Sequence, residues 1–419
     1  MAKKSPNNSQ ARSLIGTILA AIVLLIAVLA GGITGEDLNV LLDMLGQPTL
    51  VIPTSAPVTV TPPATIAPGT PPPTGSSGVT IIPVGPQGFG AERDFWQVYF
   101  NAPSGSRDAS TYVGGIDTYL ATAINGAQTT VDMAAFEFNS VVLTQALLDA
   151  HQRGVRVRMV TDDEHGLEDD LTTIGQLIDA GIPVRDDNRS GLMHNKFTII
   201  DGREVWSGSM NYTINGAYRN NNNLIMLRSN RAILSYQAEF NEMFGSGAFG
   251  PRSSRGNSVS YTDRSVPIQT LFAAEDDVLG AIIGKIDQAQ TSIHFMAFSF
   301  TEDAIGDAVL ERANAGTTVQ GIFERVGSET TFSELTRFFC AGLDVRQDGN
   351  PFILHHKVII VDERIVLTGS FNFSQNATTV NDENMLIIED PALAQQYMAE
   401  FERRLAESLV PDSADLTCS

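Results

Sequence analysis

The sequence predicts an α/β protein built from two copies of one domain, each a mainly parallel, mixed β-sheet flanked by helices, packed together as a pseudo-dimer. The first observation is a repeat. Segments 123–136 and 285–298 both run through a helix end, an Ala-Gln turn and an apolar strand. The second is that each strand is followed by a helical pattern and then by another apolar strand, which is typical of βαβ units. A period of 162 residues indicates duplicated domains rather than a solenoid.

The chain divides into five regions. We expect a cytoplasmic N-terminus at 1–12, a transmembrane signal anchor at 13–35, a short stem and disordered spacer at 36–91, and the two domains at 92–250 and 251–419. The hydrophobic content of 43% supplies material for two cores. The spacer contains 11 of the 19 prolines, so we expect it to be extended and to bury no core.

The expected anchor is uncharged and consists mostly of Leu, Ile, Val and Ala. A helix of this length can cross a hydrocarbon core of about 30 Å. Lys3, Lys4 and Arg12 precede it and acidic residues follow it, which predicts a cytoplasmic N-terminus and a body outside the cytoplasm. A cleaved signal peptide is the alternative, and it also exports the body. We therefore expect a single-pass protein of the cell membrane, or a secreted protein if the segment is removed.

Charge and cysteine content narrow the function classes. The formal net charge of −21 argues against a protein that coats nucleic acid through a broad basic surface, but it leaves room for a local basic pocket. Cys340 and Cys418, the two cysteines, are too few for a disulfide scaffold or a structural zinc site. Two alternatives stay open for them: a disulfide in an exported body, which we favour, or two free thiols.

A second repeated stretch carries the polar residues. Each half contains HxKxxxxD, followed seven positions later by GSxN. The residues are His194, Lys196, Asp201, Ser209 and Asn211 in the first half, and His355, Lys357, Asp362, Ser370 and Asn372 in the second. One such spacing arises easily by chance. Two complete copies, 161 residues apart within an independent duplication, are a specific signal.

These residue types suit one kind of chemistry. A His and a Lys two positions apart on a strand share a face. A Gly-Ser pair can bring a backbone N–H and a hydroxyl close to an anion. Two copies packed together supply two each of His, Lys, Ser and Asn. That set fits a phosphate diester, because the cations neutralise its oxygens while the histidines flank phosphorus in line.

Both motifs and the duplication resemble the phospholipase D superfamily, the HKD phosphodiesterases, over roughly residues 95–405. The resemblance implies a two-step reaction that needs no metal and no cofactor. One histidine attacks phosphorus to form a phosphohistidine, and the other protonates the leaving alcohol and then activates water or a second alcohol. It implies that His194 is the nucleophile and that His355 is the acid and base.

The resemblance also assigns the remaining motif residues. Lys196 and Lys357 would hold the nonbridging oxygens, aided by the Ser and Asn of each GSxN. Asp201 and Asp362 would fix the geometry of the motif rather than contact substrate. We expect no metal site, because His356 points to the opposite strand face from its neighbour and no carboxylate or Cys has ligand spacing.

One position departs from the family pattern. The family places an acidic residue near Glu383 to orient a catalytic histidine, whereas Asn222 occupies the corresponding place in the first half. An amide oxygen stabilises an imidazolium less than a carboxylate does. We therefore hypothesise that Glu383 backs His355, which would make His355 the more basic histidine and a candidate for the nucleophile.

Three function classes follow. The first is a phospholipase D that hydrolyses a headgroup ester to phosphatidic acid, or transfers the phosphatidyl group to an alcohol, with phospholipid as substrate and the membrane as partner. The second is an extracellular nuclease, which the negative charge disfavours. The third is a non-catalytic binding module, which the intact His and Lys in both halves argue against. No obligate protein partner is evident. We favour the first class.

Overall fold

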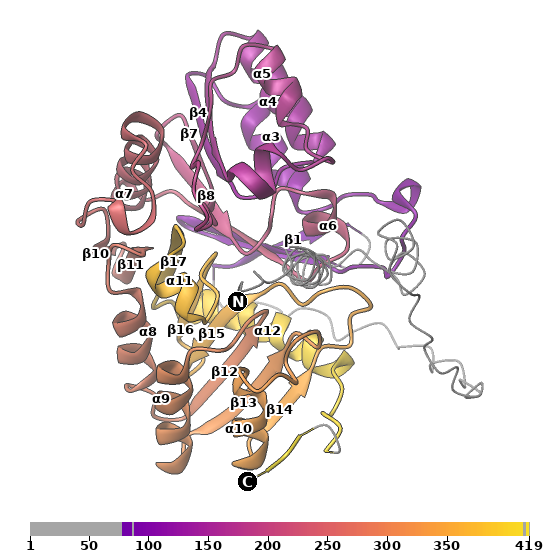
Figure 1. Ribbon diagram of the computed structural model, residues 1–419, viewed down its shortest axis with the longest axis vertical. Helices are drawn as coiled ribbons and strands as arrows, with labels where there is room; N and C mark the ends of the chain where they lie inside the picture. The colour runs from indigo at the N-terminus through magenta and orange to yellow at the C-terminus, as the bar shows by residue number, and fades with distance from the viewer. Residues whose placement is uncertain (1–77, 86–87, 414–415, 419) are drawn as a thin grey trace, which may run out of the picture. The chain divides into compact units, whose positions relative to one another are not determined.

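The computed structural model describes residues 78–85, 88–413 and 416–418, all within one compact unit, Thr70–Ser419. The expected N-terminus and anchor, and most of the expected spacer, lie outside these residues. Within the described part of the chain, no helix combines the length and the apolar character needed to cross a bilayer. The described residues form two sheets with helices against them (Figure 1).

Each half contributes one sheet. The first sheet has the order β1-β2-β3-β9-β8-β7-β4-β5-β6 and the second β10-β11-β17-β16-β15-β12-β13-β14. The first-sheet strands are β1 Thr80–Val84, β2 Gly88–Arg93, β3 Trp96–Phe100, β4 Thr130–Ala135, β5 Arg156–Thr161, β6 Val184–Asp186, β7 Lys196–Ile200, β8 Glu204–Gly208 and β9 Asn223–Leu227. The second-sheet strands are β10 Val259–Asp263, β11 Val266–Ala273, β12 Ser292–Ala297, β13 Thr318–Phe323, β14 Asp344–Gln347, β15 Lys357–Val361, β16 Ile365–Gly369 and β17 Glu383–Ile388.

The sheets are mixed, and the expectation that they are mainly parallel is wrong. Among the described strands, only β4–β5–β6 and β12–β13–β14 pair in parallel, and every other neighbouring pair is antiparallel. The reason lies in the HxKxxxxD motif itself. The motif continues into a tight turn, so β7–β8 and β15–β16 return as hairpins, which must be antiparallel. The βαβ units that the sequence predicted are present, but they supply only one edge of each sheet.

Helices cover both sheets. They are α3 Asp117–Asn125, α4 Val141–Gln152, α5 Ile174–Asp179, α6 Ile214–Tyr218, α7 Asn230–Asn241, α8 Val278–Ile286, α9 Asp303–Asn314, α10 Glu334–Cys340, α11 Gln375–Thr379 and α12 Pro391–Glu407, with short helical turns η1 Ala109–Thr111, η2 Asp163–Leu167, η3 Glu242–Ser246 and η4 Gly250–Arg252. Helices α3, α4 and α5 lie against the first sheet, and α8, α9 and α10 against the second (Figure 1).

One core is shared by the two halves. It joins side chains of both sheets with those of α7 and α12, including Phe197 and Tyr236 from the first half and Tyr397 from the second. Strands in the middle of the sheets alternate between this shared core and the core of their own half. In β15, Val358 and Ile360 belong to the shared core, while Ile359 and Val361 belong to the second half's own core with α8, α9 and α10. The expected packing of two duplicated domains against each other is therefore present.

The folded body begins earlier than the expected boundary at residue 92. Strand β1, Thr80–Val84, and most of β2, Gly88–Arg93, lie within the segment that we expected to be spacer. The two strands pair with each other and extend the edge of the first sheet beyond β3. Pro83 sits in the outermost strand, where a residue that cannot donate a ladder hydrogen bond is tolerated.

The cysteines pair, as the favoured alternative proposed. The Cys340–Cys418 disulfide joins the end of α10 to the C-terminal tail, with Cα atoms 5.4 Å apart. The loop that it closes spans 78 residues of sequence separation and includes β15 to α12. A cross-link across so long a loop constrains the unfolded chain strongly.

The shared core predicts how the body unfolds. Phe197 is fully buried in it, so Phe197→Ala should cost about 3–5 kcal/mol of unfolding free energy. Because both sheets pack on this core, urea denaturation followed by tryptophan fluorescence and circular dichroism should show one transition at a lower midpoint. Phe323→Ala, a deletion in the second half's own core, is the size-matched control. A Phe197→Ala variant whose second half melts separately at the wild-type midpoint would contradict the shared core.

Candidate active site

The two HxK motifs lie at the same place in their sheets. Lys196 and Lys357 are the first residues of β7 and β15, and they pair with Ala135 and Ala297 at the carboxyl ends of β4 and β12. His194 therefore lies just before its strand, as does its counterpart in the other half. Both motifs thus stand where the parallel strands β4 and β12 end, the edge at which α/β sheets place their ligand-binding residues.

Each histidine is oriented by a residue of the other half. His194 Nδ1 lies 2.7 Å from Glu383 Oε2 on β17, and both side chains are buried. The hypothesis that Glu383 backs His355 is therefore wrong. Glu383 corresponds by position to Asn222, but the two halves pack so that each of these residues reaches across the boundary. With the carboxylate accepting from Nδ1–H, a neutral His194 carries its lone pair on Nε2.

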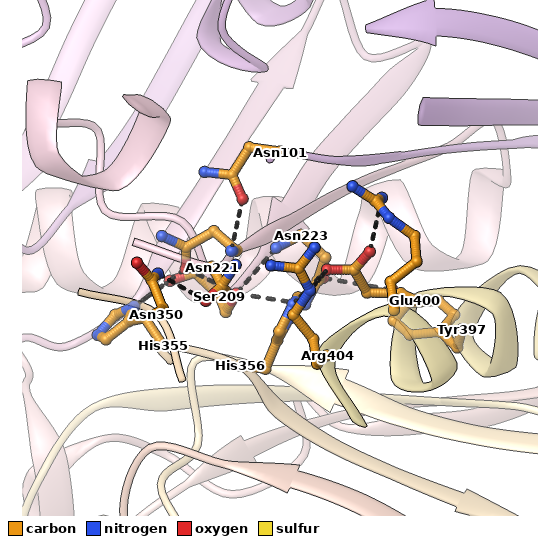
Figure 2. A network of polar contacts seen from close by, with 12 residues as sticks. Asn101, Ser209, Asn221, Asn223, Asn350, His355, His356, Tyr397, Glu400 and Arg404 are labelled. Carbon is orange, nitrogen blue, oxygen red and sulfur yellow. Dashed lines mark hydrogen bonds and ion pairs between the residues drawn. The ribbon is translucent and has the colours of Figure 1, made fainter. Parts of the chain in front are cut away.

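His355 has the reciprocal arrangement with weaker acceptors. Its Nδ1 lies 3.0 Å from Asn222 Oδ1 and 3.0 Å from the backbone oxygen of Ser209. Figure 2 shows His355 close to Ser209. Both acceptors come from the first half. An amide and a carbonyl hold the Nδ1–H tautomer but contribute no negative charge, so an imidazolium at His355 is stabilised less than one at His194.

Backbone hydrogen bonds also link each histidine to the other half. His194 N–H donates to Asp382 O at 3.0 Å, and His355 N–H donates to Asn221 O at 2.9 Å. In each case the acceptor immediately precedes the residue that backs the histidine ring. Main chain and side chain together therefore fix both imidazoles across the boundary between the halves.

The two motif serines contact the acceptors of the histidines. Ser209 Oγ donates to Asn222 Oδ1 at 2.8 Å, and Ser370 Oγ donates to Glu383 Oε2 at 2.6 Å. The expected contact of the serines with phosphate stays a prediction. In this arrangement the serines are positioning residues, because each holds the acceptor that orients a histidine.

The preceding glycine allows this close packing. Gly208 has φ +135°, and a Cβ there would lie 2.5 Å from the backbone oxygen of Asn223. Gly369 has the same relation to Asn384 in the second half. A side chain would push β8 from β9 and move the serine that follows.

The lysines are buried and close to the histidines. Lys196 Nζ donates to His194 O at 2.7 Å, and Lys357 Nζ donates to His355 O at 3.0 Å. Each ammonium also lies over an aromatic ring, Lys196 at 4.6 Å from the centroid of Phe136 and Lys357 at 4.5 Å from that of Phe298. Each lysine is thus held between a backbone oxygen and an aromatic face.

Burial dominates the electrostatics of the site. It lowers the pKa of Lys196 to about 7, and burial followed by repulsion from Lys196 lowers that of Lys357 well below its usual value. Burial, reinforced by the lysines, also lowers the pKa of both His194 and His355. The pKa of Glu383 rises to about 7, again through burial. An anion between the lysines would restore their positive charge, so the site is built to receive one.

The two phenylalanines also contact the histidines. The Phe136 ring lies 4.7 Å from that of His194, and the Phe298 ring lies 4.9 Å from that of His355, measured between centroids. Each ring therefore lines the site and limits the positions open to the imidazole and the ammonium beside it.

Asn211 and Asn372 differ in their surroundings. Asn211 Nδ2 donates to Glu137 Oε2 at 2.6 Å. At the corresponding place beside Asn372, the second half has Ser299. Burial raises the pKa of Glu137 and Lys196 opposes that rise, which indicates that the carboxylate lies within electrostatic reach of the lysine. Sequence reasoning missed Glu137, although comparing Phe136-Glu137-Phe138 with Phe298-Ser299-Phe300 would have exposed it.

The motif aspartates lie at the far end of their strands, as expected for residues that set motif geometry. Asp201, with φ 53°, accepts from the backbone N–H groups of Gln128, Thr129 and Thr130. Although burial opposes the effect, these donors lower the pKa of Asp201 to about 2. Asp362 accepts from the matching N–H groups of 290–292. Each aspartate thus ties its hairpin turn to the Ala-Gln turn of the repeat.

Two further carboxylates support the histidines. Asp162 Oδ2 accepts from the N–H of Met193, and Glu324 Oε2 accepts from the N–H of Leu354, the residues just before His194 and His355. Sequence reasoning missed both. The sequence feature that could have identified them is an acidic residue directly after each of the parallel strands β5 and β13.

Three carboxylates could in principle hold a cation. Asp162, Asp163 and Asp187 offer oxygens within 4.8 Å of one another. Asp162 already accepts from two backbone N–H groups, and Asp187 accepts from the N–H of Asp163 and faces Arg189 at 3.5 Å. The cluster therefore serves the loop that carries His194, and nothing beyond its acidity indicates a metal.

His356 lies outside the reactive group. Its Nδ1 accepts from Asn223 Nδ2 at 3.1 Å, and its Nε2 donates to Glu400 Oε1 on α12 at 3.3 Å (Figure 2). Arg404 completes this buried cluster through an ion pair with Glu400. His356 therefore links β15 to α12, in keeping with the expectation that it points away from its neighbour.

The comparisons with known proteins agree with this site. A family model described as "Cardiolipin synthase, PLD-like domain" matches residues 120–244 and 282–405, which together exceed half of the chain. Each match contains one HxKxxxxD motif with its GSxN. The family match therefore follows the same duplication as the two sheets.

Individual relatives match over part of the chain. A mitochondrial cardiolipin hydrolase of Xenopus laevis is 38% identical over 119 residues, 28% of this chain and 56% of that protein. A phospholipase D of Rickettsia conorii is 34% identical over 151 residues, 36% of this chain and 75% of that protein. The chain thus spans about half the length of the hydrolase. The crystal structure of phosphatidylserine synthase from Haemophilus influenzae aligns with a TM-score of 0.56 at 15% identity, covering 75% of this chain and 87% of that one. At this level of identity, the structural similarity is evidence for a shared fold and for nothing more.

The cross-boundary pairing predicts the effect of Glu383→Gln. The variant keeps an acceptor for His194 Nδ1–H but removes the charge that stabilises an imidazolium. Loss of such an orienting carboxylate typically costs about 10- to 100-fold. We expect kcat/KM for a chromogenic phosphodiester to fall by about that factor, with the melting temperature as the control for folding. A change of less than about threefold would contradict the role given to Glu383.

Asn222→Asp is the reciprocal variant. A carboxylate there would raise the pKa of His355, so its protonated form would persist to higher pH. If His355 acts as the acid, the alkaline limb of the kcat/KM profile should move to higher pH, while Glu383→Gln should not move it in that direction. An unmoved limb would contradict the assignment.

Proposed function

Because the chain belongs to the phospholipase D superfamily and is a phospholipase D-like phosphodiesterase, we propose that it hydrolyses the headgroup ester of a phospholipid through a phosphohistidine on His194. The observation that carries the proposal is the pairing of His194 Nδ1 with Glu383 at 2.7 Å. That contact directs the Nε2 lone pair of a neutral imidazole toward substrate and stabilises the positive charge that develops as the N–P bond forms.

The reaction takes two steps. His194 Nε2 attacks phosphorus, the P–O bond to the headgroup breaks, and His355 gives its Nε2 proton to the leaving alkoxide. His355 then takes a proton from water, whose oxygen attacks phosphorus, and the N–P bond breaks to release a phosphate monoester. An alcohol in place of water gives a new diester. Lys196 and Lys357 neutralise the nonbridging oxygens, which carry the growing charge in both steps.

The role of His355 as acid and base agrees with the uncharged hydrogen-bond acceptors of its Nδ1–H. It must hold a proton in the first step and lose it readily before the second. The amide and carbonyl acceptors of Asn222 and Ser209 fix its tautomer without raising its basicity as a carboxylate would. The asymmetry between Glu383 and Asn222 therefore supports the assignment of the two roles.

The choice of phospholipid rests on relatives and on charge. The phospholipase D and the cardiolipin hydrolases that match at 34–38% identity bear lipid-related names, although the alignments cover only part of each. The net charge of −21 disfavours approach to a polyanion such as nucleic acid. The same charge disfavours docking on an anionic bilayer, so a phosphodiester in a bilayer without a strong negative charge is the substrate class that agrees with both observations.

We further propose that the catalytic body lies outside the cytoplasm. The uncharged segment 13–35 with basic residues before it supports export, and so does the Cys340–Cys418 disulfide, because such cross-links persist in oxidising compartments. Segment 13–35 would then hold the enzyme at the membrane that contains its substrate, or export it if cleaved.

Full-length protein in mild detergent, with EDTA present, should release choline from phosphatidylcholine and form phosphatidic acid. His194→Ala and His355→Ala should each lower the rate by at least about 1,000-fold, because each removes one half of a covalent acid–base mechanism. With a substrate that has an acidic leaving alcohol, His355→Ala should accumulate an acid-labile phosphoryl group on His194.

The controls distinguish the alternatives. A single-stranded oligonucleotide is assayed alongside the lipid. Cleavage of the oligonucleotide with no lipid turnover would replace the proposal with the nuclease class. A phosphoryl group trapped on His355 would overturn the assignment of roles.

A further inference from the structure

Glu137 gives the first half-site a negative charge that the second half-site lacks. It follows the carboxyl end of β4, where the second half has Ser299 after β12. Apart from Glu383 and Asn222, which orient the two histidines, the half-sites match closely: His, Lys, Phe, Ser and Asn occupy equivalent positions in both. A carboxylate at one of two otherwise equivalent positions calls for a functional explanation.

The carboxylate lies in the site. Its Oε2 accepts from Asn211 Nδ2 at 2.6 Å, and the side chain influences both Lys196 and Lys357 electrostatically. It is half-buried, so solvent screens its field only in part. Burial raises the pKa of Glu137, while Lys196 and the Asn211 hydrogen bond oppose that rise. When ionised, the carboxylate places a negative charge close to the position where the diester must bind.

Such a charge has no part in the two chemical steps. The proton transfers are carried by His194 and His355, and Glu383 already backs His194. One phosphate diester carries a single negative charge, which the two lysines exceed. Glu137 therefore leaves the diester itself attractive to the site while opposing any second anion beside it.

We propose that Glu137 is a specificity-determining residue that selects phosphodiesters whose arms are neutral or cationic and rejects those with a second anionic group next to the scissile phosphate. This inference rests on the proposed function and refines its substrate class. It favours a choline- or ethanolamine-type arm and disfavours polynucleotides and lipids whose headgroup carries another phosphate.

If Glu137 had only a structural role, its substitution would have a different effect on activity. If the side chain only holds Asn211, then Glu137→Gln should behave as wild type, because the amide oxygen can accept the same hydrogen bond. If its charge selects substrates, the same variant should change the relative rates on singly and multiply charged diesters. The isosteric variant therefore separates the two roles, and Glu137→Ser tests the residue that the second half uses.

The test compares two water-soluble substrates with the same leaving group. They are the p-nitrophenyl ester of thymidine 5′-phosphate and the same compound with an added 3′-phosphate. The full-length chain should give a kcat/KM at least about tenfold lower for the doubly phosphorylated compound. In Glu137→Gln and Glu137→Ser that ratio should shrink to within about threefold. Glu311→Gln, on the exposed surface of α9, removes the same charge elsewhere and should keep the wild-type ratio.

The pH dependence provides a second readout. The wild-type discrimination should weaken below the pKa of Glu137, where the carboxyl is neutral, whereas Glu137→Gln should show no such change. An unchanged ratio in Glu137→Gln, or an equal loss of discrimination in Glu311→Gln, would overturn the inference. Failure of the wild type to cleave even the singly charged ester would instead overturn the proposed diesterase chemistry, and this inference with it.

Discussion

The candidate site depends on one constraint: each motif histidine is oriented by the other half of the molecule. Glu383 from the second half accepts from His194, while Asn222 and the Ser209 carbonyl from the first half accept from His355. A buried imidazole needs a fixed acceptor to hold its tautomer. Because each histidine takes its acceptor from the other half, the site is complete only when two halves are paired, and the duplication places both halves in one chain.

The rest of the fold positions the two halves so that each histidine meets its acceptor in the other half. The shared core of α7, α12 and the two sheets sets the distance between the halves, and the Asp201 and Asp362 turns fix each hairpin to its own sheet. Gly208 lets β8 approach β9 closely enough for Ser209 to hold Asn222. Small shifts in these supports would move a histidine relative to the substrate, so residues far from phosphorus still bear on the rate.

The sequence predicted the duplicated domains, because the duplication left a repeated spacing. The structural role of Asp201 and Asp362 came from the family resemblance, and their hydrogen bonds to the Ala-Gln turns agree with it. The sequence did not predict that Glu383 serves His194, since alignment of the halves gives equivalence but not which half a side chain reaches. It also missed Glu137, which breaks the repeat rather than following it. The first strand was missed because its proline, Pro83, resembles the prolines of the spacer, and an edge strand tolerates a proline.

The most direct test of this account is ¹⁵N–¹H NMR of the histidine rings. With six histidines in the chain, the signals of His194 and His355 can be assigned by substitution. The account predicts a strongly downfield Nδ1–H for His194 that disappears in Glu383→Ala, while the His355 signal stays within its normal range and responds to Asn222→Ala. Loss of the His355 signal in Glu383→Ala, with His194 unchanged, would contradict the exchange of partners between the halves.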